Sequence, residues 1–261
     1  MRLPNIFFIA TLLIFNLLAC KNNAPDDTQN TPMVFQERTA KWASKLCDTD
    51  DTRCATIEIT YPVAIQGNAA AVPAINDSIM YYVKQSIGIF ASSPEELPAS
   101  MDSIAVSFIR EYESFIAEQS DYEIGWEIET NGQVLYQSAQ YVAIELSNYS
   151  YAGGAHPNGN VTLLNFDTRS GKKLEINDLV TDSKQLAKIA ELEFRKAREL
   201  TPDADLAAEG FFWGEGFKLP TNIAITEQGL YFYYNPYEVA AYAAGPTDFV
   251  ITYEALKPIW K

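Results

Sequence analysis

The first half of the chain switches between a strand pattern and two helix patterns. Residues 56–63 alternate polar with apolar side chains, which predicts a half-buried β-strand. Apolar residues then recur at the spacing of one helix face and predict a helix over residues 74–90; they are Ile75, Ile79, Val83, Ile87 and Phe90. Ser100 can cap a second helix, whose apolar face comprises Met101, Ile104, Phe108, Tyr112 and Phe115. Both faces are expected to be core.

The segments flanking these helices complete a first unit. Residues 35–46 are interpreted as a short helix. Residues 122–129 alternate again, and the following Asn131-Gly132 is the dipeptide preferred in hairpin turns, so the chain is expected to return antiparallel after it. The first unit, residues 35–152, is therefore predicted to be an α+β domain with an antiparallel sheet.

A second unit, residues 153–261, is expected after a stretch rich in Gly, Pro and Asn at residues 150–159. A strand is predicted over residues 161–167. A helix capped by Asp182 or Ser183 follows, and its apolar face comprises Leu186, Ile189, Ala190, Phe194 and Ala197. The aromatic run Phe211-Phe212-Trp213-Gly214 is assigned to a loop.

The most informative stretch is residues 229–253. Residues 223–226 and 230–234 predict a hairpin, because a short Gly-containing connection joins two β-prone runs. Asn235, Pro236 and Glu238 have the order of a helix start, with a cap, a proline at the first position and a carboxylate three residues after the cap. A short helix is therefore predicted there, followed by a strand over residues 249–253. The whole chain is predicted to be α+β, with two adjacent units, each an antiparallel sheet packed with one or two helices.

The N-terminus has the pattern of an export signal. Arg2 precedes a short apolar stretch at residues 6–18, which is too short to span a membrane comfortably. The sequence Leu-Leu-Ala before Cys20 resembles the bacterial lipobox, which implies a signal peptide at residues 1–19 and acylation of Cys20. Residues 20–34 are expected to be a flexible tether. The expected location is the bacterial cell envelope, at the outer membrane or cell surface, with the lipid anchor as the only contact with the membrane.

The remaining cysteines and the net charge narrow the chemistry. With Cys20 lipidated, Cys47 and Cys54 are left as a pair in an oxidising compartment, and a disulfide is expected. The formal charge of −15 disfavours nucleic acid as a partner, because phosphate binding needs clustered Lys and Arg. It would attract a cationic partner, although acidity is more often a property that keeps a protein soluble.

Motifs for catalysis are scarce. His156 is the single histidine, so a catalytic triad would have to use it, and a zinc site would lack ligands. No cofactor or metal is expected. A pair of carboxylates acting on glycan remains open, because 34 acidic residues are present and no spacing singles out a pair. Loop aromatics favour binding instead, because rigid rings bury much area at low entropic cost; the candidates are Tyr151, Trp213 and Tyr237.

Two motifs carry a family resemblance. The run YFYYNPYEVAAYAAGP, together with the earlier GGAHPN that contains His156, resembles the extracytoplasmic region of the RsiV/PdaC-like family over residues 55–253. The resemblance implies a PdaC-like domain followed by an RsiV-like domain. RsiV-type domains are lysozyme receptors, so the loops at residues 150–158 and 235–238, with Pro236 and Glu238, would form the corresponding face.

The expected function is a lipid-anchored binding protein without catalysis that recognises lysozyme-like proteins or cell-wall glycan. The sequence shows neither the sigma-binding and transmembrane segments of RsiV nor the catalytic domain of PdaC, so their activities are not expected to carry over. The alternative is an envelope enzyme that acts on glycan through paired carboxylates. An accessory subunit of an envelope complex is a third option.

Overall fold

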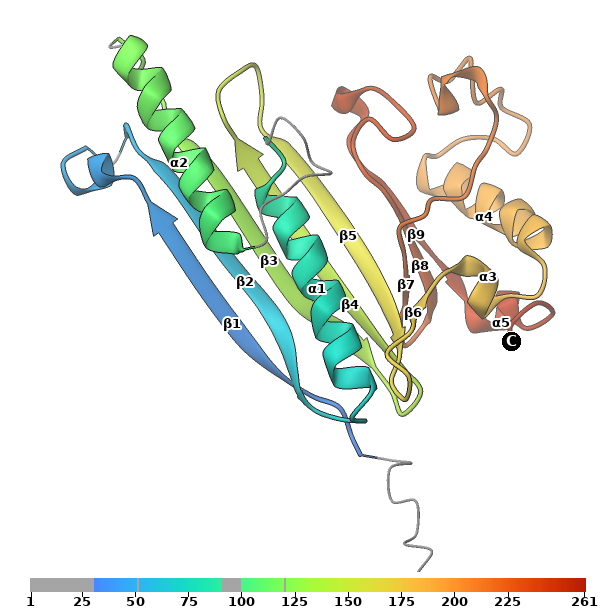
Figure 1. Ribbon diagram of the computed structural model, residues 1–261. Helices are drawn as coiled ribbons and strands as arrows, with labels where there is room; N and C mark the ends of the chain where they lie inside the picture. The colour runs from blue at the N-terminus through green and yellow to red at the C-terminus, as the bar shows by residue number, and fades with distance from the viewer. Residues whose placement is uncertain (1–30, 51, 91–99, 120) are drawn as a thin grey trace, which may run out of the picture.

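The computed structural model describes residues 31–50, 52–90, 100–119 and 121–261, and it contains a six-stranded and a three-stranded sheet (Figure 1). The large sheet has its strands in sequence order: β1 (Val34–Ala43), β2 (Ala55–Gln66), β3 (Trp126–Gln137), β4 (Tyr141–Tyr151), β5 (Asn158–Asp167) and β6 (Lys173–Leu174). All neighbouring pairs are antiparallel except β2 and β3, which are parallel. The helical crossover between β2 and β3 explains the exception, because parallel neighbours need a long connection.

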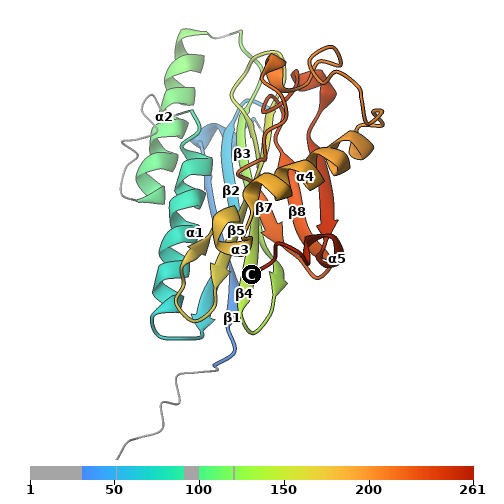
Figure 2. The same cartoon turned by 90° about the vertical axis from the view of Figure 1, so that its right-hand side faces the viewer.

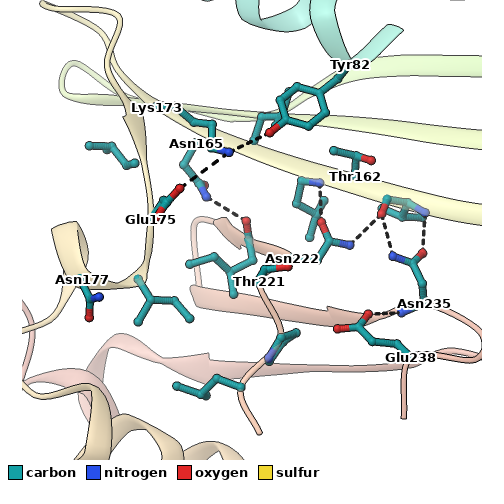
Figure 3. A pocket seen from close by; sticks show the side chains of 18 residues that line it. Tyr82, Thr162, Asn165, Lys173, Glu175, Asn177, Thr221, Asn222, Asn235 and Glu238 are labelled. Atoms are coloured by element: carbon teal, nitrogen blue, oxygen red, sulfur yellow. Dashed lines mark hydrogen bonds and ion pairs between the residues drawn. The ribbon is translucent and has the colours of Figure 1, made fainter. Parts of the chain in front are cut away.

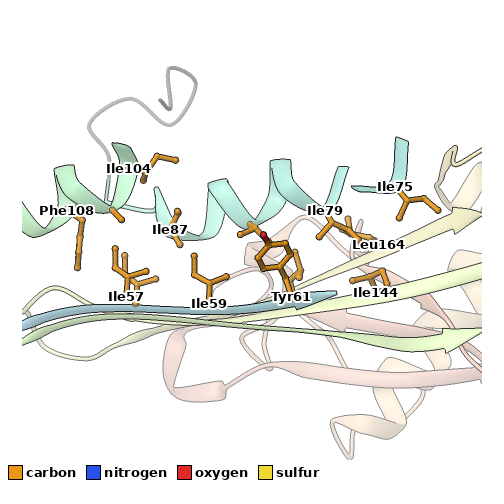
Figure 4. Close-up of a cluster of buried hydrophobic side chains, with 14 of the residues drawn as sticks. Ile57, Ile59, Tyr61, Ile75, Ile79, Ile87, Ile104, Phe108, Ile144 and Leu164 are labelled. Atoms are coloured by element: carbon orange, nitrogen blue, oxygen red, sulfur yellow. The ribbon is translucent and has the colours of Figure 1, made fainter. Parts of the chain in front are cut away.

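Helices α1 (Ala71–Ile87) and α2 (Met101–Glu118) cover one face of the large sheet (Figure 2). The apolar spacing predicted both helices, and the Ser100 side chain accepts a hydrogen bond from the Ser103 amide at the start of α2. Their buried isoleucines share one core with those of β2, and Figure 4 shows Ile87 of α1 opposite Ile59 of β2. Each buried isoleucine contributes about 1.5–3 kcal/mol by removing its side chain from water.

The small sheet forms the centre of a second core, and its strands are β7 (Ile223–Ile225), β8 (Gly229–Tyr234) and β9 (Thr247–Thr252). Helix α4 (Ser183–Ala197) packs against it through Phe194, which contacts Tyr234 on β8. Asp182 caps α4, as the sequence predicted. The remaining elements are the short helices η2 (Lys45–Asp48), α3 (Ile176–Leu179), η4 (Phe212–Gly214), η5 (Tyr242–Ala244) and α5 (Tyr253–Leu256).

Asparagine side chains join the two sheets edge to edge. On the β5 edge, the Val161 amide donates to Asn235 Oδ1 at 2.7 Å and the Leu163 amide donates to Asn222 Oδ1 at 2.6 Å. In the other direction, Asn165 Nδ2 donates to the Ile223 carbonyl at 2.8 Å, and the Ile225 amide donates to Asn165 Oδ1 at 2.7 Å. These bonds satisfy backbone groups that a strand edge would otherwise leave unpaired.

The α+β class is confirmed, with a mixed sheet in the first unit. The strand predicted at residues 161–167 is β5, which pairs with β4 along its whole length. The domain boundary at residues 152 and 153 stays a prediction. The signal peptide, Cys20 and most of the tether lie outside the described residues, and among the described residues no helix is long and apolar enough to cross a membrane.

The short helix predicted at residues 35–46 is wrong. Most of the segment is β1, which pairs with β2 from Val34 to Ala43, and only residues 45–48 form a helical turn. Pairing with a neighbouring strand supplies the hydrogen bonds that a helix would have supplied locally. Beyond this turn, Cys47 and Cys54 form a disulfide.

The hairpin turn predicted at Asn131-Gly132 is also wrong, because both residues lie inside β3 and the chain turns only after Gln137. Gly132 is needed there for close packing. A Cβ atom at this position would lie 2.6 Å from Leu146 Cδ2 and 3.1 Å from the Tyr61 Cα. A glycine inside a strand often marks such an approach of another chain segment.

Candidate functional site

The connections β4–β5 and β8–β9, far apart in sequence, meet in a cluster of three rings that we call the aromatic cluster: His156, Tyr237 and Tyr242. The His156 ring stacks on Tyr242 with centroids 3.9 Å apart, and its Nε2 lies 3.3 Å from the Tyr237 hydroxyl. His156 Nδ1 lies 2.9 Å from the Pro157 carbonyl, which can only accept, so Nδ1 carries the proton. In the neutral ring Nε2 is then an acceptor, and the Tyr237 hydroxyl donates to it.

The Tyr237 side chain is 55% exposed although its backbone is fixed. Its φ of 68° lies in the left-handed region, which non-glycine residues adopt at a cost of about 1–3 kcal/mol. The loop is held on both sides, because the Asn235 amide donates to Glu238 Oε2 at 2.9 Å and the Glu238 amide donates to the Asn235 carbonyl at 3.0 Å. Tyr237 is therefore presented to solvent in one conformation.

The helix predicted to begin after Asn235 is absent, and the reason is local. The Asn235 Oδ1 atom accepts from Val161 on β5, so it is not available to cap a helix. The left-handed Tyr237 also interrupts any helix at its second residue. Of the predicted cap, only the bond to the Glu238 carboxylate is present, and the segment that follows contains only the short turn η5.

An arginine from α4's end fixes the far side of the same loop. Arg198 donates from Nη1 to the Ala244 carbonyl at 3.0 Å and from Nη2 to the Pro246 carbonyl at 3.0 Å. Its Nε donates to the Thr247 hydroxyl at 2.7 Å. The loop that carries Tyr237 and Tyr242 is thus fastened at both ends, by Asn235 to the large sheet and by Arg198 to α4.

The two other candidate aromatic residues, Trp213 and Tyr151, lie in segments that contact the loops of the cluster. Trp213 is 62% exposed, and its neighbour Phe212 donates an amide hydrogen bond of 2.6 Å to Val239, so η4 lies against the Tyr237 loop. Tyr151 lies at the end of β4, and its hydroxyl donates to the Gly154 carbonyl at 2.9 Å within the loop that carries His156. The structure brings His156, Tyr237 and Glu238 together with Pro236, and it adds Tyr242, which the sequence reasoning missed.

Below the cluster a cleft of about 450 Å³, which we call the interunit cleft, separates β5 and β6 from the segment 219–223 (Figure 3). Tyr82 of α1 and the charged residues Lys173, Glu175 and Glu238 lie on its walls. Lys173 Nζ donates to the Tyr82 hydroxyl at 2.8 Å and lies 3.9 Å from Glu175 Oε1. Sequence reasoning did not find this cleft, because segments distant in sequence form it.

Glu238 connects the cleft with the cluster, since it follows Tyr237 in the chain and lines the cleft wall. Partial burial raises the pKa of its carboxyl group above the ordinary value, and the hydrogen bond from the Asn235 amide works in the opposite direction. Glu175 lies at the opposite end of the cleft in Figure 3. In the described part of the chain, no group of three or more His, Cys, Asp or Glu side chains is placed to hold a metal ion.

Two family models match the chain. Residues 49–159 match the family described as deacetylase PdaC, and residues 177–254 match the family described as a protein of unknown function, DUF3298. The chain carries a PdaC-like domain followed by a DUF3298 domain. His156 lies in the first match, whereas Tyr237 and Tyr242 lie in the second. The aromatic cluster therefore forms where the two domains meet.

Known proteins resemble the chain over most of its length. The chain is 25% identical over 202 residues to the peptidoglycan-N-acetylmuramic acid deacetylase PdaC of Bacillus subtilis. The matched region covers 75% of the chain and 42% of that protein. The chain thus spans less than half the length of this relative. A DUF3298 family crystal structure from Bacteroides fragilis superposes with a TM-score of 0.68 at 17% identity and covers 89% of the chain and 95% of that structure. A DUF3298 protein from Pseudomonas aeruginosa gives 0.61 at 22% identity over 88% of the chain and 95% of its own length. Both show the fold.

Proposed function

We propose that the chain is a lipid-anchored binding protein of the bacterial cell envelope that recognises peptidoglycan glycan without modifying it. The observation that carries the proposal is the aromatic cluster, in which Tyr237 is exposed, fixed in one backbone conformation and hydrogen-bonded to His156. A binding surface gains affinity when its aromatic side chains are ordered before the ligand arrives. The deacetylase relative acts on peptidoglycan, as its name states, and this supports the ligand class.

A sedimentation assay with purified peptidoglycan tests the proposal. The chain from residue 21 onward should pellet with the wall material, and Tyr237→Ala should weaken the apparent affinity at least about tenfold, which is the effect of losing a hot-spot side chain. Tyr81→Ala serves as the matched control, because Tyr81 is equally exposed, at 54%, but lies on α1, which contributes no ring to the cluster. Equal loss in both variants, or no pelleting of the unaltered chain, would refute the proposal.

The same incubation decides between binding and catalysis. An envelope enzyme with paired carboxylates would release soluble fragments or deacetylated sugar from the wall material. The raised pKa of Glu238 inside the cleft makes it the residue to test, because a general acid needs such a shift. Fragments released by the unaltered chain but not by Glu238→Gln would replace the binding proposal with the enzymatic one.

A second candidate is a cationic protein such as lysozyme, and the large sheet supplies a specific reason. Glu58, Glu127 and Glu129 are exposed on the face of the sheet that α1 and α2 do not cover, since they alternate with the core residues Ile57 and Ile128. The formal charge of −15 adds long-range attraction.

Calorimetry with lysozyme at increasing salt tests this second candidate. Binding that weakens steeply with salt, and that a Glu127→Lys/Glu129→Lys variant loses, would support a protein partner. Absence of lysozyme binding at low salt would remove this candidate and leave the glycan proposal unaffected.

A further inference from the structure

Some polar side chains of the interunit cleft are hydrogen-bonded within the protein, and others are not. The side-chain amides of Asn165, Asn222 and Asn235 are all engaged with strand edges. By contrast, the side chains of Thr162, Thr221 and Asn177 line the cleft without a hydrogen bond to any other protein group in the described part of the chain. Figure 3 shows the two threonines on facing walls. Donors and acceptors are therefore available on both sides of the cleft.

The charge in the cleft argues against an anionic ligand. Lys173 is the one cationic side chain among the lining residues, and it is already paired with Glu175 and hydrogen-bonded to Tyr82. Glu238 adds an acid at the other end. A phosphate or carboxylate entering the cleft would meet no uncompensated positive charge and would be repelled by Glu238.

Apolar surface completes the description of the cleft. The walls include aliphatic side chains and a proline between the polar groups, namely Leu164, Leu174, Ile176, Leu219 and Pro220. The volume of about 450 Å³ lies within the range of about 300–1,000 Å³ that holds small ligands. Hydroxyl and amide partners next to aliphatic surface match a sugar ring, which has hydroxyl groups at its edge and C–H groups on its faces.

We propose that the interunit cleft binds a short, uncharged oligosaccharide. Thr162 and Thr221 exchange hydrogen bonds with its hydroxyl groups from opposite walls, and Glu238 accepts from a hydroxyl at the end nearest to the aromatic cluster. The site is separate from the ring surface formed by His156 and Tyr237. It deepens the proposed function and rests on it in one respect, because wall glycan held at the cluster would supply the sugar.

Amide chemical-shift mapping with N,N′-diacetylchitobiose and with cellobiose tests the cleft. Either disaccharide, at roughly 10 mM, should shift the backbone amides of Thr162, Asn177 and Thr221. Thr221→Val keeps the side-chain shape and removes the hydroxyl, so binding should weaken about three- to tenfold. Thr221→Trp places a large ring at the exposed edge of the cleft and should abolish binding while leaving the fold intact, because position 221 is exposed.

The controls separate this proposal from the preceding one. Tyr237→Ala should leave disaccharide binding unchanged while it reduces sedimentation with peptidoglycan. If Tyr237→Ala abolishes disaccharide binding and Thr221→Trp does not, the cleft proposal is wrong and the cluster alone binds glycan. If the disaccharides bind in the cleft but the chain does not pellet with peptidoglycan, the wall-binding function is wrong and the cleft site stands. Chitobiose, the deacetylated disaccharide with two positively charged amino groups, is measured beside them. Absence of shifts with both uncharged sugars, or shifts only with chitobiose, would overturn the uncharged-ligand proposal.

Discussion

Replacing Asn165 by alanine should destabilise the protein more than its size suggests, because this side chain joins two sheets. Asn165 lies on β5 and is 2% exposed. It donates to the Ile223 carbonyl and accepts from the Ile225 amide, both on β7. Alanine can make neither bond, so one carbonyl and one N–H group are left buried without partners.

The magnitude follows from the two orphaned groups. A buried polar group that loses its partner costs about 1–3 kcal/mol, so removing both bonds should cost about 2–6 kcal/mol. Domains of this kind have unfolding free energies of about 5–15 kcal/mol, and the loss is therefore a large fraction of the total. The junction between β5 and β7 should open before the core under α1 and α2 does, because that core keeps all its apolar contacts.

Urea denaturation followed by tryptophan fluorescence and by circular dichroism measures this loss. Asn158→Ala is the matched control, since Asn158 lies on the same strand, is exposed and makes no side-chain hydrogen bond in the described structure. The control should change the free energy of unfolding by less than about 0.5 kcal/mol. A loss below about 1 kcal/mol for Asn165→Ala would show that the asparagine bonds do not hold the sheets together, and the account of the junction would be wrong.

Three further outcomes are expected. Gly132→Ala should destabilise the protein by about 1–3 kcal/mol in the same denaturation assay, because the added Cβ atom overpacks the sheet. Gly159→Ala should be nearly neutral, because the nearest atom to its added Cβ would lie 3.9 Å away. Because the pKa of Glu238 is raised in the folded state, the folded state binds more protons than the unfolded state between the ordinary and the raised pKa, and stability should fall as pH rises through that window. Glu238→Gln should flatten this part of the profile of stability against pH. An unchanged profile would show that Glu238 is not desolvated. Replacing Cys47 and Cys54 together by serine should lower the free energy of unfolding by about 2–3 kcal/mol relative to the oxidised unaltered chain, because the loop constraint is lost. The reduced unaltered chain should match the variant in the same assay.

Local patterns were sufficient for most of the secondary structure. The apolar spacing of α1 and α2 and the cap at Ser100 depend only on residues close together in the sequence, and the structure confirms them. The hairpin of β7 and β8 is equally local, because a short connection joins its strands. The sequence could not show that the segment at Asn131 continues straight, since Asn-Gly is a turn signal unless another chain segment packs closely against the glycine.

The candidate site was predicted only in part, and the reason is the same. The family resemblance implied that the loops of His156 and Tyr237 share one face, and the fold brings the His156 Nε2 atom within 3.3 Å of the Tyr237 hydroxyl. Tyr242 had no signal that distinguishes it from the other tyrosines of the aromatic run. Asn165 and Asn222 were missed because an asparagine that satisfies the edge of a distant strand has the same local sequence as one in an exposed turn.

The Tyr237 loop links the sheet junction, the aromatic cluster and the interunit cleft through consecutive residues. Asn235 binds the β5 edge with its side chain, Tyr237 presents its ring to solvent, and Glu238 faces the cleft while accepting from the Asn235 amide. A ligand that binds Glu238 from the cleft would therefore act on the same short segment that orders Tyr237. Because the Glu238 carboxylate accepts from the Asn235 amide, a ligand that competes for this carboxylate should shift the backbone amides of residues 235–238, although the Tyr237 ring itself does not line the cleft.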